Sequence, residues 1–309
     1  MAHLSVVIPV YQAEGFLEEL YRRLKASLNR ISKDHEIVFV EDCGGDKSWP
    51  LLLQLARKDK KVKAIQLSRN FGQHYAITAG LDNVNADWVV VMDCDLQDRP
   101  EDIARLYEKA LEGFDVVFGV RANRQDSFMK RFVSSFFYKV FNVFTNLEYD
   151  GRIGNFCIVS RKVVECLGDM REKLRFFGGI LEWMGFPSAK VEVQHPKSSR
   201  GKSSYSYSKL LKLGSDAIIA YSDKPLWLAV QAGFTLAFIS FFLGGYHLYR
   251  AFSQGAPVMG WASLIVSIYF LSGVIIGILG IVGIYVGKTF DETKKRPLYV
   301  IREKRNLPH

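Results

Sequence analysis

Short apolar runs alternate with segments of helical periodicity over the first part of the chain. The apolar runs are rich in β-branched residues, as is typical of buried strands, and lie at 4–10, 36–40, 62–67, 88–92 and 116–120. The segments between them predict helices at 14–29, 49–58, 73–81 and 100–112, and further strands are expected at 154–160 and 189–193. Continuous apolar strands separated by helices indicate an α/β fold with a mostly parallel, Rossmann-like sheet covered on both faces.

Two much longer apolar runs follow near the C-terminus. They span residues 226–249 and 261–287, contain no Asp, Glu, Lys or Arg, and are each longer than the roughly 20 residues that cross a bilayer as a helix. Basic residues flank the pair on its outer sides: Lys209, Lys212 and Lys224 before it, and Lys288, Lys294, Lys295 and Arg296 after it. The positive-inside rule therefore predicts a transmembrane hairpin with both flanks in the cytoplasm.

These patterns divide the chain into successive parts. We expect a cytoplasmic α/β domain at 1–205, an amphipathic juxtamembrane helix at 206–225, transmembrane helices at 226–249 and 261–287 joined by an external loop at 250–260, and a basic cytoplasmic tail at 288–309. The N-terminus lacks the pattern of a signal peptide, so both termini are expected in the cytoplasm of a plasma or inner membrane protein. The aromatic-rich segment 128–146 fits either a core helix or one lying at the membrane interface.

Charge and cysteine content narrow the classes of partner. The formal net charge is +9, but much of the basic excess lies beside the apolar runs or in the tail, which favours membrane lipids over nucleic acid. The four cysteines form no C-x-x-C pair, which suits a reducing compartment and predicts no thiolate metal site.

An acidic cluster, Asp93-Cys94-Asp95, follows the most continuous of the apolar strands. Carboxylates two residues apart lie on the same side of a strand, and such oxygen ligands suit Mg²⁺ or Mn²⁺ held together with substrate phosphates. Gln97 or Asp98 is expected to add or orient a ligand. The alternative is a solvated acidic turn in which Asp98 caps the helix that begins at Pro100.

Other polar residues also follow predicted strands, and ligands of such sheets bind beyond the carboxyl ends of the strands. Asp42 follows the second strand and is placed to accept hydrogen bonds from a base or ribose, with the segment from Pro9 to Tyr11 beside the ring. The alternative for Asp42 is a turn-forming residue before Gly44 and Gly45.

Several motifs together resemble those of family 2 glycosyltransferases, in particular the polyprenyl- or dolichyl-phosphate glycosyltransferases. The motifs are Ser5-Val-Val-Ile-Pro-Val-Tyr11, Glu41-Asp42, Arg69-Asn-Phe-Gly-Gln-His74, Asp93-Cys-Asp-Leu-Gln-Asp98 and Arg200-Gly-Lys-Ser203. The resemblance covers essentially the whole chain. It implies a GT-A fold, a cytoplasmic catalytic domain, and inverting transfer of one sugar from a nucleotide-diphosphate sugar to a polyprenyl phosphate such as undecaprenyl phosphate.

The resemblance also implies roles for individual residues. The nucleotide sugar would be contacted by Pro9, Tyr11, Glu14, Asp42 and Asp93, and the metal and diphosphate by Asp93, Asp95 and Gln97. The phosphates, including that of the acceptor, would be contacted by Arg121, Arg131, Ser135, Arg200 and Lys202.

One position departs from the bacterial relatives, many of which carry Gly-Asp-Phe where this chain has Gly154-Asn155-Phe156. In other family 2 enzymes a carboxylate at about this place is the base, and Asn cannot take a proton. A lipid phosphate is already an anion near pH 7 and needs positioning rather than deprotonation. Asn155 therefore fits a phosphate acceptor, while altered donor recognition and impaired activity are the alternatives.

Other functions are less consistent with the sequence. Gly201-Lys202-Ser203 resembles the end of a P-loop, but its earlier glycine and its strand-to-helix context are missing. A processive polysaccharide synthase would need a Q-x-x-R-W element, which the chain lacks. A non-catalytic membrane adaptor or a lipid-carrier translocase is the third alternative, and the uncharged spans argue against a translocase. Glycines in the second apolar run permit close packing between the two spans or between subunits of a homo-oligomer: Gly273, Gly277, Gly280, Gly283 and Gly287. The sugar, the base and the downstream pathway are not determined by the sequence.

Overall fold

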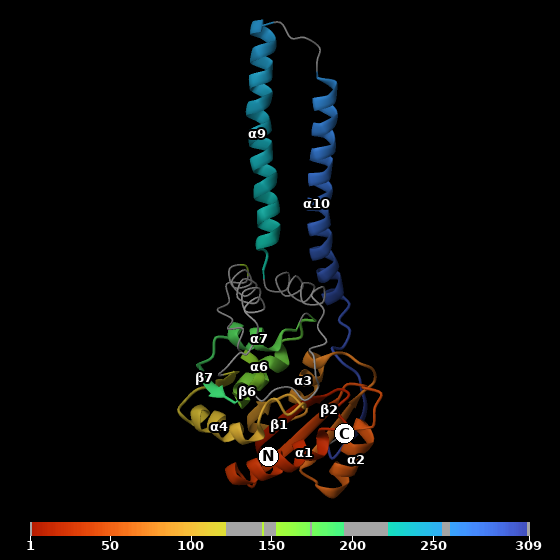
Figure 1. The fold of residues 1–309 in the computed structure, drawn as a ribbon, viewed down its shortest axis with the longest axis vertical. Helices are drawn as coiled ribbons and strands as arrows, with labels where there is room; N and C mark the ends of the chain where they lie inside the picture. The colour runs from red at the N-terminus through yellow and green to blue at the C-terminus, as the bar shows by residue number, and fades with distance from the viewer. Residues whose placement is uncertain are drawn as a thin grey trace. The chain divides into compact units, whose positions relative to one another are not determined.

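Strands and helices alternate along the N-terminal part of the computed structural model, as the hydrophobic pattern predicts (Figure 1). The structure describes residues 2–121, 144, 153–173, 175–194, 222–254 and 260–307. The chain divides into two compact units, one made of residues 1–211 and 297–309 and the other of residues 212–296.

The first unit is built on one sheet of eight strands, in the order β7-β5-β6-β4-β1-β2-β3-β8. Its strands are β1 (Ala2–Val10), β2 (His35–Glu41), β3 (Val62–Leu67), β4 (Ala86–Val91), β5 (Val116–Arg121), β6 (Ile153–Ser160), β7 (Ser188–Val193) and β8 (Ile301–Arg305). Strands β1 to β4 are mutually parallel, whereas β6 runs antiparallel to both of its neighbours, β4 and β5. The carboxyl ends of β1 to β5 and the start of β6 therefore lie at one edge of the sheet.

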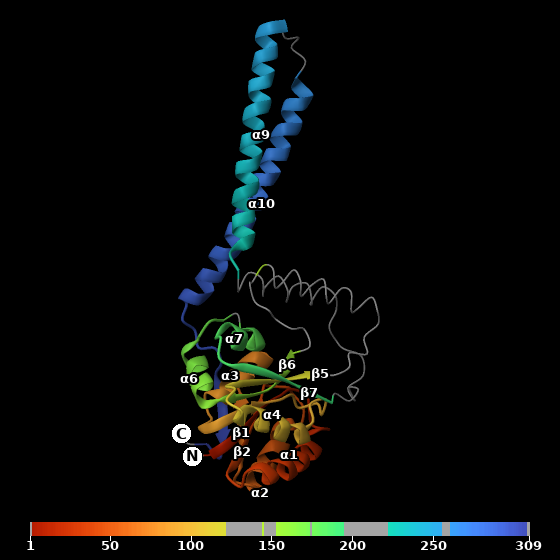
Figure 2. The ribbon, with the colours of Figure 1, turned by 90° about the vertical axis from the view of Figure 1, so that its left-hand side faces the viewer.

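Helices cover both faces of this sheet (Figure 2). One face carries α1 (Leu17–Ile31), α2 (Ser48–Lys58) and α4 (Ile103–Leu111), which follows the short 3₁₀ helix η1 (Pro100–Asp102). The other face carries α3 (Gln73–Leu81), α6 (Arg161–Asp169) and α7 (Phe177–Trp183). The predicted α/β fold with a mostly parallel sheet is confirmed, although α6 and α7 were not predicted.

The amphipathic pattern of α1 shows why these helices dock. Its buried leucines, Leu17, Leu20, Leu24 and Leu28, recur every three or four residues and form one stripe against the sheet. Glu18 and Glu19 lie in the first turn and Arg30 in the last, where their charges complement the helix dipole. The strands beneath are buried on both faces, as in β2, where every residue is buried.

The last strand, β8, comes from the part of the chain that follows the apolar helices. It pairs antiparallel with β3 at the edge of the sheet, and the backbone N–H of Ser68 donates to Val300 O at 2.8 Å. The sequence pattern assigned residues 288–309 to a basic tail. That assignment missed β8, because the charged residues of an exposed edge strand carry no apolar alternation.

The second unit contains two long helices, α9 (Lys224–Gln254) and α10 (Trp261–Thr293). Both are long and apolar enough to span a bilayer, and among those of their apolar side chains that the structure describes almost none are buried. Both helices extend beyond the predicted spans, since backbone hydrogen bonding continues into the flanking polar residues. The predicted juxtamembrane segment lies outside the described residues as far as 221, and so does most of segment 128–146.

The glycines of α10 do not mediate its packing against the described residues of α9. A Cβ atom placed at Gly273, Gly277, Gly280, Gly283 or Gly287 would meet no described atom within 4 Å. Of the two uses that the sequence left open for these glycines, packing between the spans is therefore not seen in the described residues.

Candidate active site

The acidic cluster lies in the loop directly after β4, at the edge where the strand ends converge. Two hydrogen bonds from backbone N–H groups to aspartate side chains close this loop. The N–H of Asp93 donates to Asp98 Oδ2 at 3.1 Å, and the N–H of Gln97 donates to Asp95 Oδ1 at 3.1 Å. Asp98 is buried and is used to hold the loop, and the helix η1 that follows has no side-chain cap. The loop thus has a defined conformation that presents Asp93 and Asp95, both partly exposed.

Two side-chain amides converge on one oxygen of Asp93. Gln73 Nε2 donates to Asp93 Oδ1 at 2.7 Å, and Asn155 Nδ2 lies 3.4 Å from the same atom. The position of Asn155 follows from the direction of β6. Val91 pairs with Cys157, so the antiparallel register carried two residues further sets Asn155 opposite Asp93. The structure therefore brings together two of the predicted site residues and adds Gln73.

The donor set fits a divalent cation that is shared with a substrate. Asp93 and Asp95 supply carboxylate oxygens from one loop, and no group of three or more His, Cys, Asp or Glu side chains suited to a metal exists among the described residues. Mg²⁺ in particular is commonly bound by one or two carboxylates and completes its shell with waters and phosphate oxygens. Two carboxylates suffice for a metal that arrives with a diphosphate.

Asp42 has a structural role that the sequence did not predict. Its side chain is only 3% exposed, and its two oxygens accept the backbone N–H groups of Phe71 and Gly72 at 2.7 and 2.8 Å. Burial raises the pKa of Asp42, and these two hydrogen bonds oppose the rise because they favour the ionised form. Asp42 thereby fixes the loop between β3 and α3. Its contact with a nucleotide stays a prediction.

The loops after β1 and β2 are joined to each other. Glu14 accepts the N–H of Lys47 at 2.9 Å, and its own N–H donates to Asp46 Oδ2 at 3.2 Å. Beside them, the ring of Tyr11 is 41% exposed at the carboxyl end of β1, whereas Pro9 is buried within the strand. The exposed ring of Tyr11 is therefore better placed than Pro9 to lie against a base.

Unusual backbone conformations gather at this edge. Gln12, Cys43 and Leu96 have φ of 48°, 54° and 62°, and they lie in the loops after β1, β2 and β4. Gly72, with φ of 107°, lies in the loop after β3. Left-handed conformations of residues other than glycine carry a free-energy cost and persist where the surrounding structure requires them, commonly at functional sites. Their grouping supports this edge as the active site.

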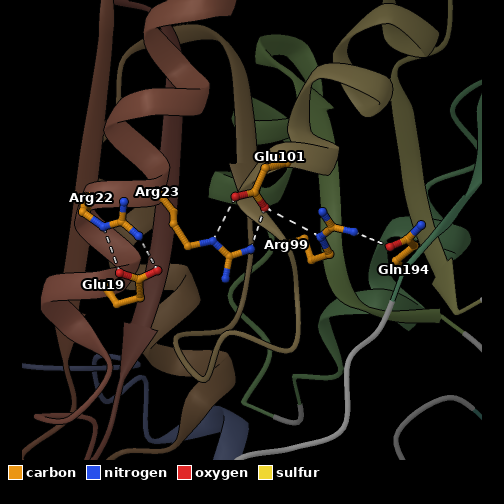
Figure 3. A network of polar contacts seen from close by, with 6 residues as sticks. All are labelled: Glu19, Arg22, Arg23, Arg99, Glu101 and Gln194. Carbon is orange, nitrogen blue, oxygen red and sulfur yellow. Dashed lines mark hydrogen bonds and ion pairs between the residues drawn. The ribbon is translucent and has the colours of Figure 1, made fainter.

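A network of polar contacts holds the segment that directly follows the acidic cluster (Figure 3). Arg99, which follows Asp98, contacts both Glu101 and Gln194, and Glu101 also receives two hydrogen bonds from Arg23 of α1, at 2.9 and 2.6 Å. Gln194 directly follows β7. The network therefore ties the segment after the acidic cluster to α1 and to the end of β7.

The predicted phosphate contacts are less fully described. Arg121 is the last residue of β5, so its backbone lies at the same edge as Asp93. Arg131, Ser135, Arg200 and Lys202 lie outside the described residues. Sequence reasoning missed Gln73 as a site residue. Its signal was present in the motif Arg69–His74, which the resemblance included without assigning it a role.

The sequence also matches known proteins, and the family match identifies the class of protein. Residues 5–168 match the family described as "Glycosyl transferase family 2", which covers more than half of the chain. The chain belongs to this family and is a glycosyltransferase, and the GT-A fold that the resemblance implied is confirmed by the family and the sheet.

Relatives match over nearly the full length. The chain is 37% identical to an uncharacterized glycosyltransferase, YkcC, of Bacillus subtilis (strain 168), over 97% of this chain and 93% of the relative. It is 34% identical to a prophage bactoprenol glucosyl transferase homolog of Escherichia coli (strain K12), over 97% and 98% of the two chains. It is also 34% identical to the bactoprenol glucosyl transferase of Shigella phage SfX, over 98% and 99%.

Among solved structures, the chain is similar to glucosyl-3-phosphoglycerate synthase from Mycobacterium tuberculosis in complex with phosphoglyceric acid. It has a TM-score of 0.49 and 13% identity, over 71% of this chain and 78% of that chain.

Proposed function

We propose that this glycosyltransferase transfers a single sugar, with inversion, from a nucleotide-diphosphate sugar to a polyprenyl phosphate such as undecaprenyl phosphate. The reaction would take place at the cytoplasmic face of the membrane and supply a lipid-linked sugar for cell-envelope glycans or lipid modification. The observation that carries the proposal is the closed loop after β4, which presents Asp93 and Asp95 beside the amides of Gln73 and Asn155.

The donor side of the reaction rests on the two carboxylates. Asp93 and Asp95, with Gln97 as the predicted additional ligand, would hold Mg²⁺ or Mn²⁺. A divalent ion bound there would neutralise charge on the nucleoside diphosphate and ease its departure. We expect the exposed ring of Tyr11 to lie against the base, with the loop that Asp42 fixes beside it.

The acceptor side rests on Asn155 and on the relatives. An amide at this position cannot act as a base, and an ionised phosphate oxygen needs none. That oxygen would form the new bond to the anomeric carbon while the bond from this carbon to the diphosphate breaks, and no proton has to move. Two relatives are bactoprenol glucosyl transferases or homologues of one, which supports a lipid phosphate acceptor. Arg121, Arg131, Ser135, Arg200 and Lys202 remain the predicted phosphate contacts.

The membrane hairpin is supported by exposure and by chain connectivity. Large apolar side chains such as Phe234 and Tyr269, each 75% exposed, would be unfavourable in water along helices of this length. Residues 1–211, which precede α9, and residues 297–309, which follow α10, belong to one compact unit. A crossing by α9 therefore has to be reversed by α10, and the flanking lysines favour the cytoplasm for that unit.

The test uses the full chain purified in detergent, with a screen of radiolabelled UDP-, GDP- and other nucleotide sugars and undecaprenyl phosphate as acceptor. The expected product is a lipid carrying one sugar, abolished by EDTA and by Asp95→Ala. Asp34→Ala is the matched control, because Asp34 is an exposed aspartate just before β2, at the opposite edge of the sheet. Turnover that survives EDTA would refute the metal-dependent mechanism, and a polymeric product would refute single-sugar transfer.

A further inference from the structure

Gln73 is the first residue of α3, and its side chain reaches from that helix to the acidic loop. The distance of 2.7 Å from Gln73 Nε2 to Asp93 Oδ1 is that of a well-formed hydrogen bond to a carboxylate. The second amide, that of Asn155, approaches the same oxygen at 3.4 Å, near the outer limit of such a contact. Of these two amides, Gln73 is therefore the stronger donor to Asp93.

The backbone that carries Gln73 is itself held from another strand. Gly72, the residue before it, has φ of 107°, a backbone conformation that residues other than glycine rarely adopt, and its N–H donates to Asp42 Oδ2. The neighbouring N–H of Phe71 is bound by the other Asp42 oxygen, and the Arg69 guanidinium lies 4.5 Å from the centre of the Phe71 ring. The buried carboxylate of Asp42, directly after β2, thus fixes the backbone position from which the Gln73 side chain extends.

From these contacts we propose that Gln73 is a positioning residue for Asp93, and that Asp42 acts on the acidic loop through Gln73. The inference deepens the proposed function and rests on it. A neutral amide is suited to this role because it fixes one carboxylate oxygen without bringing a charge that would compete with a cation. Partners that orient metal-binding carboxylates in this way typically contribute 10–100-fold to metal affinity.

The coupling between Asp42 and Gln73 also has a consequence for binding of the nucleotide-sugar donor. Asp42, a predicted nucleotide contact, holds the backbone of residues 71–72. Gln73, the next residue, orients Asp93, which is the predicted contact for the metal and the diphosphate. A shift of residues 71–72 would therefore move the Gln73 amide away from Asp93. The two halves of the donor site are linked through Asp42, the 71–72 backbone, Gln73 and Asp93.

The experiment measures Mn²⁺ binding to the full-length protein in detergent by electron paramagnetic resonance. The probe is Mn²⁺ together with whichever of UDP, GDP, CDP or ADP gives the strongest binding to the unmodified protein. Gln73→Leu keeps most of the side-chain volume without the donor, and Gln73→Asn keeps an amide that is one methylene too short. Both are expected to weaken Mn²⁺ binding by about 10-fold. Gln54→Leu, at an exposed position on α2, is the control and should leave it unchanged.

Further readouts separate positioning from a general structural role. Binding of the same nucleotide in EDTA, by calorimetry, and the melting temperature in EDTA should stay at the values of the unmodified protein. In turnover assays the Mn²⁺ concentration at half-maximal rate should rise about 10-fold, while the rate at saturating Mn²⁺ recovers. Unchanged Mn²⁺ affinity in both Gln73 variants, or equal losses of metal and metal-free nucleotide binding, would overturn the positioning role alone. If the unmodified protein binds Mn²⁺ with none of the nucleotides, the proposed function falls and the positioning role falls with it.

Discussion

Gly80 determines how closely α3 lies against the sheet, and replacing it with alanine tests the packing that holds Gln73 in place. A Cβ at residue 80 would lie 2.2 Å from Val7 Cγ1 and 3.2 Å from Val40 Cγ2. The first distance is well short of the 3.4 Å of an ordinary contact. Val7 is fully buried in β1, and its β-branched side chain has few alternative rotamers. The helix, rather than Val7, is therefore expected to move.

The magnitude follows from two opposing effects. Overpacking of a dense core typically costs about 1–3 kcal/mol, while alanine in place of glycine within a helix returns about 0.8–1 kcal/mol. Because the 2.2 Å approach to Val7 Cγ1 puts the overpacking cost in the upper part of that range, about 2–3 kcal/mol, the net loss for Gly80→Ala is about 1–2 kcal/mol, or roughly 5 °C in melting temperature for a domain of this size. Displacement of α3 should also weaken Mn²⁺ binding, because the Gln73 amide moves with the helix.

Gly168→Ala is the matched control. Gly168 lies in α6, and a Cβ there would meet no described atom within 4 Å, so only the gain in helix propensity of about 0.8–1 kcal/mol remains. Thermal unfolding of the full chain in detergent, followed by tryptophan fluorescence, should show opposite shifts for the two variants. A melting temperature for Gly80→Ala equal to or above that of Gly168→Ala would refute the packing argument.

Three further predictions concern ionic and hydrogen-bond contacts and the edge of the sheet. Burial disfavours the ionised form of Asp59, but hydrogen bonds from Lys25 and Tyr21 outweigh it and lower the pKa of Asp59 to about 2. A carboxyl group whose pKa is lower in the folded than in the unfolded protein stabilises the fold at pH values above its unfolded pKa. Asp59→Asn should therefore lower the free energy of unfolding by about 1 kcal/mol at pH 7. Urea titrations should show the difference between the two proteins shrinking as the pH falls from about 4 to 2. The hydroxyl of Tyr299 donates to Asp82 at 2.7 Å, beside the two hydrogen bonds from Arg171, so Tyr299→Phe should cost about 1 kcal/mol in the same titration at pH 7. Deletion of residues 297–309 should be more severe and cause concentration-dependent association in light scattering, because it exposes the β3 edge; a monodisperse truncated protein would contradict this.

Local patterns were sufficient for much of the fold. The β-branched runs predicted the positions of β1 to β7, and the leucine spacing of α1 predicted a helix that buries one face. The direction of β6 was not predictable, because an apolar run reads the same in a parallel and an antiparallel strand. β8 was missed since its residues are mostly exposed and charged, and only pairing with β3 makes them a strand.

Within the site, the acidic cluster shows the same division between what the sequence predicts and what the tertiary structure decides. Its residue types and its place after a buried strand pointed from the sequence alone to an oxygen-ligand site at the carboxyl edge of the sheet. Only the tertiary structure placed Gln73 and Asn155 on the same Asp93 oxygen and committed Asp42 to the backbone of residues 71–72. The physical reason is range: hydrophobic periodicity and turn chemistry act between residues close in the chain. These contacts join residues 20 to 62 positions apart, which come together only when the strands pair.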